Sequence, residues 1–249
     1  MRLIMHLGHL GRLALGAVLG LGACTYPEKE LVAQGPPFAC YNKPLPSTAA
    51  ERVTIAGTLQ DPFDGKKLTG TAVEVFLVGT AVPIFTATSD GNGAFSHDQG
   101  TGGAPRDAYL RAAPNGYLPT YFYPAVPISG NITATLQLLT AMDVATIGAV
   151  AGITVDTTKA NFLVSVIDCN GDAIAGATIS TNPPGKVTYF ANATPSPVAV
   201  ATDAMTGSAL VSSVAVSNTT INATVSGMTL RSHNLDGVAG AIMQTEIQP

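Results

Sequence analysis

Short apolar segments alternate with glycine-rich turns along most of this chain, and this pattern limits the fold more than any other feature. The clearest turn is Asp90-Gly91-Asn92-Gly93. Glycine and asparagine tolerate the positive backbone angles that a tight hairpin requires. Residues 83–88 before the turn are rich in β-branched and aromatic side chains, and Phe95 follows it. The segment therefore reads as two antiparallel strands joined by a hairpin.

Apolar and polar residues alternate with a period of two on both sides of this hairpin. Val73, Val75 and Leu77 fall on one side of an extended segment, and Glu74 falls on the other. Charged residues make up only 11% of the 249 residues, and tryptophan is absent. That composition suits many short strands better than long amphipathic helices. We predict an all-β protein with two tandem antiparallel β-sandwiches, at residues 53–138 and 159–249.

The second half repeats the plan of the first. Phe162, Val164 and Val166 alternate into a turn at 168–172, and residues 201–207 resemble the turn at Asp90. Closing strands are predicted at 214–216, 221–225 and 237–247.

Residues 139–158 between the halves contain one predicted short helix. Thr140 can cap its first turn, and Asp143 completes a capping-box-like pair three residues later. Val144 and Ile147 fall on one face, as expected for a connector packed against a sandwich.

The first 23 residues have the pattern of an export signal. Arg2 and Arg12 precede the apolar run 13–21, which is too short to span a membrane comfortably. The run ends in Leu21-Gly22-Ala23-Cys24, which resembles the bacterial lipobox.

That resemblance implies cleavage before Cys24 and attachment of acyl chains, such as palmitate, to the new N-terminus. More than one chain gives stable membrane anchoring. Thr25 follows the cysteine, which resembles lipoproteins sent to the outer membrane of Gram-negative bacteria. An ordinary secretory signal with an accidental cysteine is the alternative.

Residues 24–52 are predicted to be a flexible tether, because proline, glycine and charged residues dominate them. Cys40 lies in this tether and Cys169 lies in the second half. In an oxidising compartment these two cysteines can pair, and we favour that disulfide over two free thiols.

Four segments of the first half resemble the carboxypeptidase regulatory-like domain in order and spacing: Val53–Asp61, Leu68–Val73, Ser89–Phe95 and Asn115–Tyr117. The resemblance implies a prealbumin-like (transthyretin-like) sandwich of seven strands. It also implies an accessory, adhesive or scaffolding role, since the domain lacks peptidase chemistry. The second half matches more loosely.

Two acidic turns offer oxygen ligands at the alternate positions that calcium loops use. The same residues also form ordinary turns, and no later bidentate glutamate follows, so we expect no metal. The candidates are Asp168, Asn170 and Asp172, and, more weakly, Asp90, Asn92 and Asp98.

No set of reacting residues stands out. After signal removal only His97 and His233 could act as imidazole bases, and neither lies near a glycine-flanked serine. Intradiol dioxygenases use a related sandwich and bind iron through two tyrosines and two histidines. We predict that the protein is not an enzyme and uses no cofactor. The net charge of −4 also disfavours nucleic-acid binding.

Tyr117, Tyr121 and Tyr123 form the main aromatic cluster. They can fill the core, or they can stack on sugar rings. The preferred function is a non-catalytic surface lipoprotein whose sandwiches are structural or protein-interaction units, with membrane lipid and envelope proteins as partners. The alternative is a polysaccharide-binding lipoprotein that uses Tyr121 and Tyr123 or the glycine-rich loop 100–103.

Overall fold

A computed structural model of the chain describes residues 35–156 and 158–249. Four sequence predictions lie wholly or partly outside these residues: the export signal at 1–23, the acylated Cys24, Thr25 and the first eleven residues of the tether, 24–34. The expected all-β sandwich architecture is confirmed.

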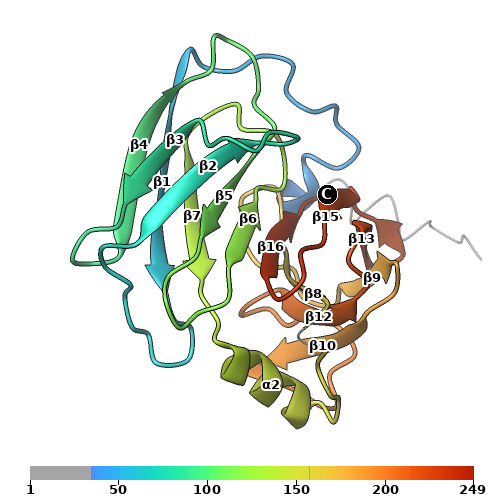
Figure 1. Cartoon of the computed structure of the whole chain (residues 1–249). Coiled ribbons are helices and arrows are strands. Elements are labelled where there is room, and N and C mark those ends of the chain that lie inside the picture. Colours follow the sequence, from blue (N-terminus) through green and yellow to red (C-terminus); the bar gives the residue numbers. More distant parts are fainter. Residues whose placement is uncertain (1–34, 157) are drawn as a thin grey trace, which may run out of the picture.

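The first half contains seven strands in two layers, which enclose one core (Figure 1). Three strands form a separate sheet in the order β4-β1-β7, and the other four form part of a larger sheet. The strands are β1 (Arg52–Gln60), β2 (Ala72–Leu77), β3 (Phe85–Thr88), β4 (Ala94–Gly100), β5 (Ala108–Ala112), β6 (Thr120–Tyr123) and β7 (Ile132–Gln137).

The second half contains nine strands and is also two-layered. Its strands are β8 (Ala160–Val166), β9 (Thr178–Asn182), β10 (Lys186–Ala191), β11 (Thr194–Pro195), β12 (Ser208–Val214), β13 (Asn218–Val225), β14 (Met228–Thr229), β15 (His233–Asp236) and β16 (Ile242–Ile247). The strand expected at 214–216 is wrong, because β12 ends at Val214 and a turn leads into β13.

One sheet of nine strands runs through both halves, in the order β11-β10-β12-β8-β16-β6-β5-β2-β3. The last strand of the chain, β16, joins them, because it pairs with β8 on one side and with β6 on the other. Both of these pairings are parallel, and so is the pairing of β1 with β7. The two sandwiches are thus connected by backbone hydrogen bonds as well as by the chain.

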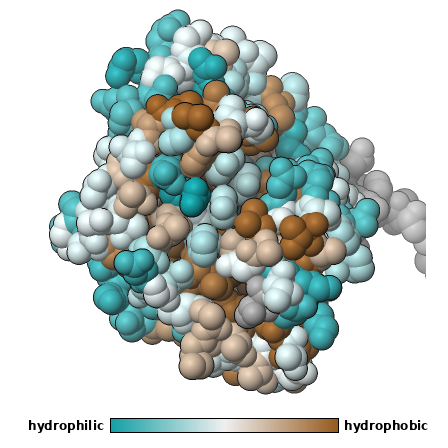
Figure 2. All heavy atoms as spheres, in the orientation of Figure 1, coloured by the Kyte–Doolittle hydropathy of each residue, from teal (hydrophilic) through white to brown (hydrophobic). Residues whose placement is uncertain are grey.

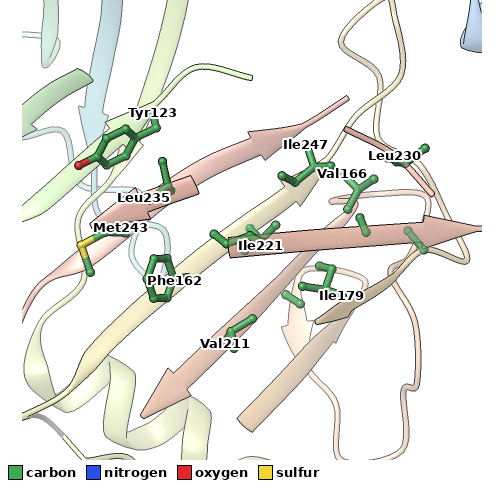
Figure 3. Packing of buried hydrophobic residues seen from close by; sticks show 14 of the residues in the cluster. Tyr123, Phe162, Val166, Ile179, Val211, Ile221, Leu230, Leu235, Met243 and Ile247 are labelled. Carbon is green, nitrogen blue, oxygen red and sulfur yellow. The ribbon is translucent and has the colours of Figure 1, made fainter. Parts of the chain in front are cut away.

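The layers that cover this long sheet lie on opposite faces in the two halves. In the first half, β4-β1-β7 covers the face that carries Val73, Val75 and Leu110, and the first core lies between them. In the second half, β9, β13 and β15 cover the other face over Phe162 and Met243 (Figure 3). Part of the long sheet next to β15 is therefore left without a covering layer.

Helix α2 (Ala141–Val150) covers the second half on the face opposite β13. The predicted capping box is confirmed: the Thr140 hydroxyl accepts a hydrogen bond from the Asp143 backbone at 3.1 Å, and the Asp143 carboxylate accepts from the Thr140 backbone at 2.7 Å. Val144 and Ile147 are buried, as predicted, among apolar side chains of the long sheet.

The described part of the predicted tether lies against the folded body. A short 3-10 helix, η1 (Pro36–Phe38), begins it, and Cys40 forms the predicted disulfide with Cys169. The aromatic rings of Phe38 and Tyr41 pack against the second core. Burial of these rings explains why this segment is not extended away from the protein.

Among residues 35–156 and 158–249, no helix is both long enough and apolar enough to cross a lipid bilayer.

Candidate functional site

The uncovered part of the long sheet borders a cavity of about 570 Å³ beside β15. We call it the tyrosine cavity, because Tyr109, Tyr121 and Tyr123 line it from β5 and β6. Strand β15, the residues that follow β2 and β6, and Leu45 of the N-terminal segment also line it. The polar residues that line it are Thr80, Asp107, Asn218, Arg231, Ser232, His233, Asn234 and Asp236.

The alternation of β5 and β6 places the three tyrosines on one face. Leu110 and Phe122 pair across these strands and point into the first core, so their neighbours point outward. Tyr121 and Tyr123 pair with Met243 and Thr245 of β16, and Met243 lies in the second core. The cavity thus forms where the covering layer of the second half stops.

The aromatic rings of the cavity stack on one another. The rings of Phe76 and Tyr109 are nearly parallel, with centroids 5.1 Å apart. The rings of Tyr109 and Tyr123 have centroids 5.0 Å apart and an interplanar angle of 29°. Tyr121 is tilted by 42° against Tyr109, and the Arg111 guanidinium lies 6.0 Å from its centroid. The tyrosines therefore do not form the open, coplanar row that sugar stacking would use.

Two carboxylates lie close enough to influence the phenols. Burial raises the pKa of Tyr123, and the charges of Tyr109, Asp236, Tyr121 and Asp107 raise it further. Burial also raises the pKa of Tyr109. Tyr109 and Tyr123 therefore stay protonated at neutral pH and can donate hydrogen bonds.

His233 closes one side of the cavity. Its Nδ1 lies 2.8 Å from the Thr245 hydroxyl, and its ring meets Tyr123 edge-on at 6.3 Å. Burial lowers its pKa, an effect that the nearby Asp107 opposes. The imidazole is therefore neutral at pH 7 and adds no positive charge to the cavity.

The face of the molecule shown in Figure 2 is mixed in polarity. On the face shown in Figure 2, apolar atoms form several small patches separated by hydrophilic ones. A broad apolar patch is the usual sign of a large protein interface. This face instead suits recognition that includes polar contacts.

The remaining candidates from the sequence are placed elsewhere. Tyr117 lies outside the cavity, where its hydroxyl donates to Asp61 Oδ2 at 3.2 Å. In the glycine-rich loop 100–103, Thr101 is buried, and its backbone N–H donates to the Glu51 carbonyl at 3.0 Å. This loop holds the end of the N-terminal segment in place.

The acidic turns use their carboxylates locally. Asp168 Oδ1 accepts backbone hydrogen bonds from Asn170 at 2.7 Å and from Asp172 at 2.9 Å, and Asp90 does the same in the first half. These are the bonds of an ordinary turn that begins with aspartate. The calcium hypothesis gains no support from this geometry.

The two histidines are held in different sheets. His97 is on β4 and stacks on Phe85 with centroids 3.8 Å apart, whereas His233 is on β15. Within the described residues, no three histidine, cysteine, aspartate or glutamate side chains are grouped so that they could hold a metal ion.

Sequence reasoning missed several residues of the cavity. Tyr109 was not singled out from the sequence, and no local pattern indicates that its ring meets Tyr123. Strand β15 was not predicted, so His233, Asn234 and Asp236 had no assigned place. Only the pairing of β6 with β16 brings these segments together.

Glu246 is a half-buried ionisable group in a crevice near Cys169 and Asn131. Burial raises its pKa, although a hydrogen bond from the Ala125 backbone lowers it in part. A raised carboxyl pKa means that the folded state holds its proton more tightly than the unfolded state. The contribution of Glu246 to the free energy of unfolding is therefore fully present below pH 4.5, the pKa of this group in the unfolded chain. It is lost as the pH rises through the higher pKa of the folded state.

We predict that Glu246→Gln stabilises the protein at pH 7 by about 1 kcal/mol, because it removes a half-buried charge without a cationic partner. Urea unfolding from pH 4 to 8 would measure this. The gain should vanish towards pH 4. Glu51→Gln, which changes an exposed carboxylate, serves as a control. A gain in Glu246→Gln that does not change with pH would contradict the prediction.

No known family model matches the chain, and no curated protein is significantly similar to it. Solved structures share the sandwich at low similarity. A catechol 1,2-dioxygenase from Acinetobacter sp. ADP1 is 13% identical over 36% of this chain and 53% of its own length, with a TM-score of 0.27. A streptococcal ancillary pilin is 11% identical, with 80% and 62% coverage and a TM-score of 0.28. The shaft pilin SpaA from Lactobacillus rhamnosus GG is 13% identical, with 82% and 98% coverage and a TM-score of 0.26.

These likenesses concern the fold alone. The chain spans about half the length of the dioxygenase that it matches. The prediction that the protein is not an enzyme is contradicted by the dioxygenases, which are enzymes built on a similar sandwich. At these scores the similarity assigns no reaction to the chain.

Proposed function

We propose that this protein is an interaction module of the bacterial cell envelope, anchored to the outer membrane by acyl chains on Cys24. Its sandwiches would present their surfaces to other envelope components. We further propose that the first sandwich belongs to the carboxypeptidase regulatory-like domains, on the four segments quoted above.

The disulfide between Cys40 and Cys169 is the observation that carries this proposal. Such bridges persist in oxidising, extracytoplasmic compartments and are rare in the cytosol. The bridge fixes the chain 16 residues after Cys24, so an anchor there would hold the second half near the membrane.

Labelled palmitate should enter the wild-type protein in a bacterial host, and Cys24→Ala should abolish the labelling. Globomycin, which blocks lipoprotein signal cleavage, should cause the uncleaved precursor to accumulate. Cys40→Ser is the matched control, because it removes another cysteine near the N-terminus and should keep full labelling. Equal labelling of Cys24→Ala and wild type would overturn the anchor.

A second candidate function, polysaccharide binding, is favoured by one specific feature. The tyrosine cavity falls within the roughly 300–1,000 Å³ range of small-molecule sites and combines aromatic with polar walls. Because Tyr109 and Tyr123 stack on each other, binding would depend on their hydroxyl edges rather than on their ring faces.

A further inference from the structure

The hydroxyl groups of the tyrosine cavity have spare hydrogen-bonding capacity. The hydroxyl of Tyr189, the other buried tyrosine among the described residues, accepts from the Ile179 backbone at 2.9 Å. Within residues 35–156 and 158–249, the hydroxyls of Tyr109, Tyr121 and Tyr123 have no such protein partner.

Tyr123 is the most informative of the three. Only 8% of this residue is exposed, yet it lines the cavity. In Figure 3 its hydroxyl points away from the other labelled side chains of the core. A tyrosine hydroxyl can both donate and accept, so one without a protein partner that opens into a cavity is free to bond a ligand there.

The charges of the cavity limit the chemistry of that ligand. Asp107 and Asp236 supply carboxylate acceptors, and the Asn218 amide donates to Asp236 at 3.1 Å. Arg231 also lines the cavity. Its Nη2 donates to the Lys43 carbonyl at 2.8 Å, and its buried Nε has no partner within the described residues. A ligand with many hydroxyl groups and no negative charge would satisfy both the phenols and the carboxylates.

We propose that the tyrosine cavity binds a neutral or amino-substituted saccharide edge-on, through the hydroxyls of Tyr109, Tyr121 and Tyr123 and the carboxylates of Asp107 and Asp236. This rests on the second candidate function and specifies its ligand. Saccharide hydroxyls donate to the carboxylates and exchange hydrogen bonds with the phenols. An ammonium group on an amino sugar strengthens the contact with Asp236, whereas a uronic acid is repelled.

The test is calorimetric titration of the full-length protein in detergent with cellotriose, N-acetylchitotriose, chitosan trimer, trigalacturonate and trilysine. At least one of the first three should bind saturably in the millimolar range or tighter, and trigalacturonate should not bind. Tyr123→Phe and Asp236→Asn should each weaken that binding roughly tenfold, since each removes a hydrogen-bonding group or its charge.

Tyr117→Phe is the matched control, because it removes a tyrosine hydroxyl outside the cavity. It should bind as wild type does. The proposal is overturned if none of the three sugars binds, if trigalacturonate binds as tightly as they do, or if the cavity variants behave like Tyr117→Phe. Binding of trilysine alone would overturn it in favour of a basic peptide. Palmitate labelling measures the acylation of Cys24 independently of this titration, so the membrane anchor and the saccharide site can each fail without the other.

Discussion

Replacing both Cys40 and Cys169 by serine should lower the free energy of unfolding by about 2–5 kcal/mol. The bridge spans 129 residues of sequence and therefore restricts the unfolded chain over more than half its length. It also positions the N-terminal segment, because the Cys169 backbone donates to the Pro37 carbonyl at 2.9 Å. Urea unfolding of exported protein, with and without reductant, would measure the difference.

Reduced wild type should match the double serine variant, and reductant should leave the variant unchanged. Proteolysis should also become faster within residues 35–51, because the loss of the bridge frees the segment that Phe38 and Tyr41 hold against the second core. Equal unfolding midpoints for oxidised and reduced wild type would show that the bridge does not stabilise the fold.

Local signals predicted local structure well. The capping pair of Thr140 and Asp143 depends on residues three apart, and the turns at Asp90 and Asp168 depend on one carboxylate that accepts nearby backbone N–H groups. Each of these can be read within a window of a few residues. The structure forms all three as the sequence indicated.

The sheet that both halves share could not be predicted from such local signals. Strand β16 is buried on both faces, a position that usually shows a continuous apolar run, but it contains Gln244, Thr245 and Glu246. Partners distant in sequence satisfy the first two: Gln244 bonds the backbone of Thr135 and Gln137 on β7, and Thr245 bonds His233. Those partners are unknown until the fold is known.

The candidate site shows the same limit. Tyr121 and Tyr123 were recognisable as part of an aromatic cluster, but the alternative hypothesis of stacking on sugar rings assumed free ring faces. Tyr109 occupies a face of Tyr123 because β5 and β6 pair in one register. The carboxylate of Asp236 reaches the same cavity only through the fold of the second half.

The central position of β16 leads to the second large effect: Thr245→Pro should destabilise both sandwiches together. Thr245 is fully buried and pairs with Tyr123 on one side and with Val164 on the other. Proline cannot donate to a ladder and is not tolerated within a central strand, so we expect a loss of about 3 kcal/mol or more. Hydrogen exchange followed by mass spectrometry should show reduced protection in β5 and β6 as well as in β8 and β12.

Thr245→Val separates the backbone effect from the side-chain effect. It keeps the N–H group and removes only the hydroxyl that contacts His233 and the Tyr123 carbonyl, so it should cost about 1 kcal/mol. If the sandwiches were independent units, proline at this position would leave the exchange of β5 and β6 as slow as in the wild type. That outcome would contradict a sheet shared through β16, because strands joined by hydrogen bonds in one sheet cannot lose a central member without exposing the backbone of its neighbours.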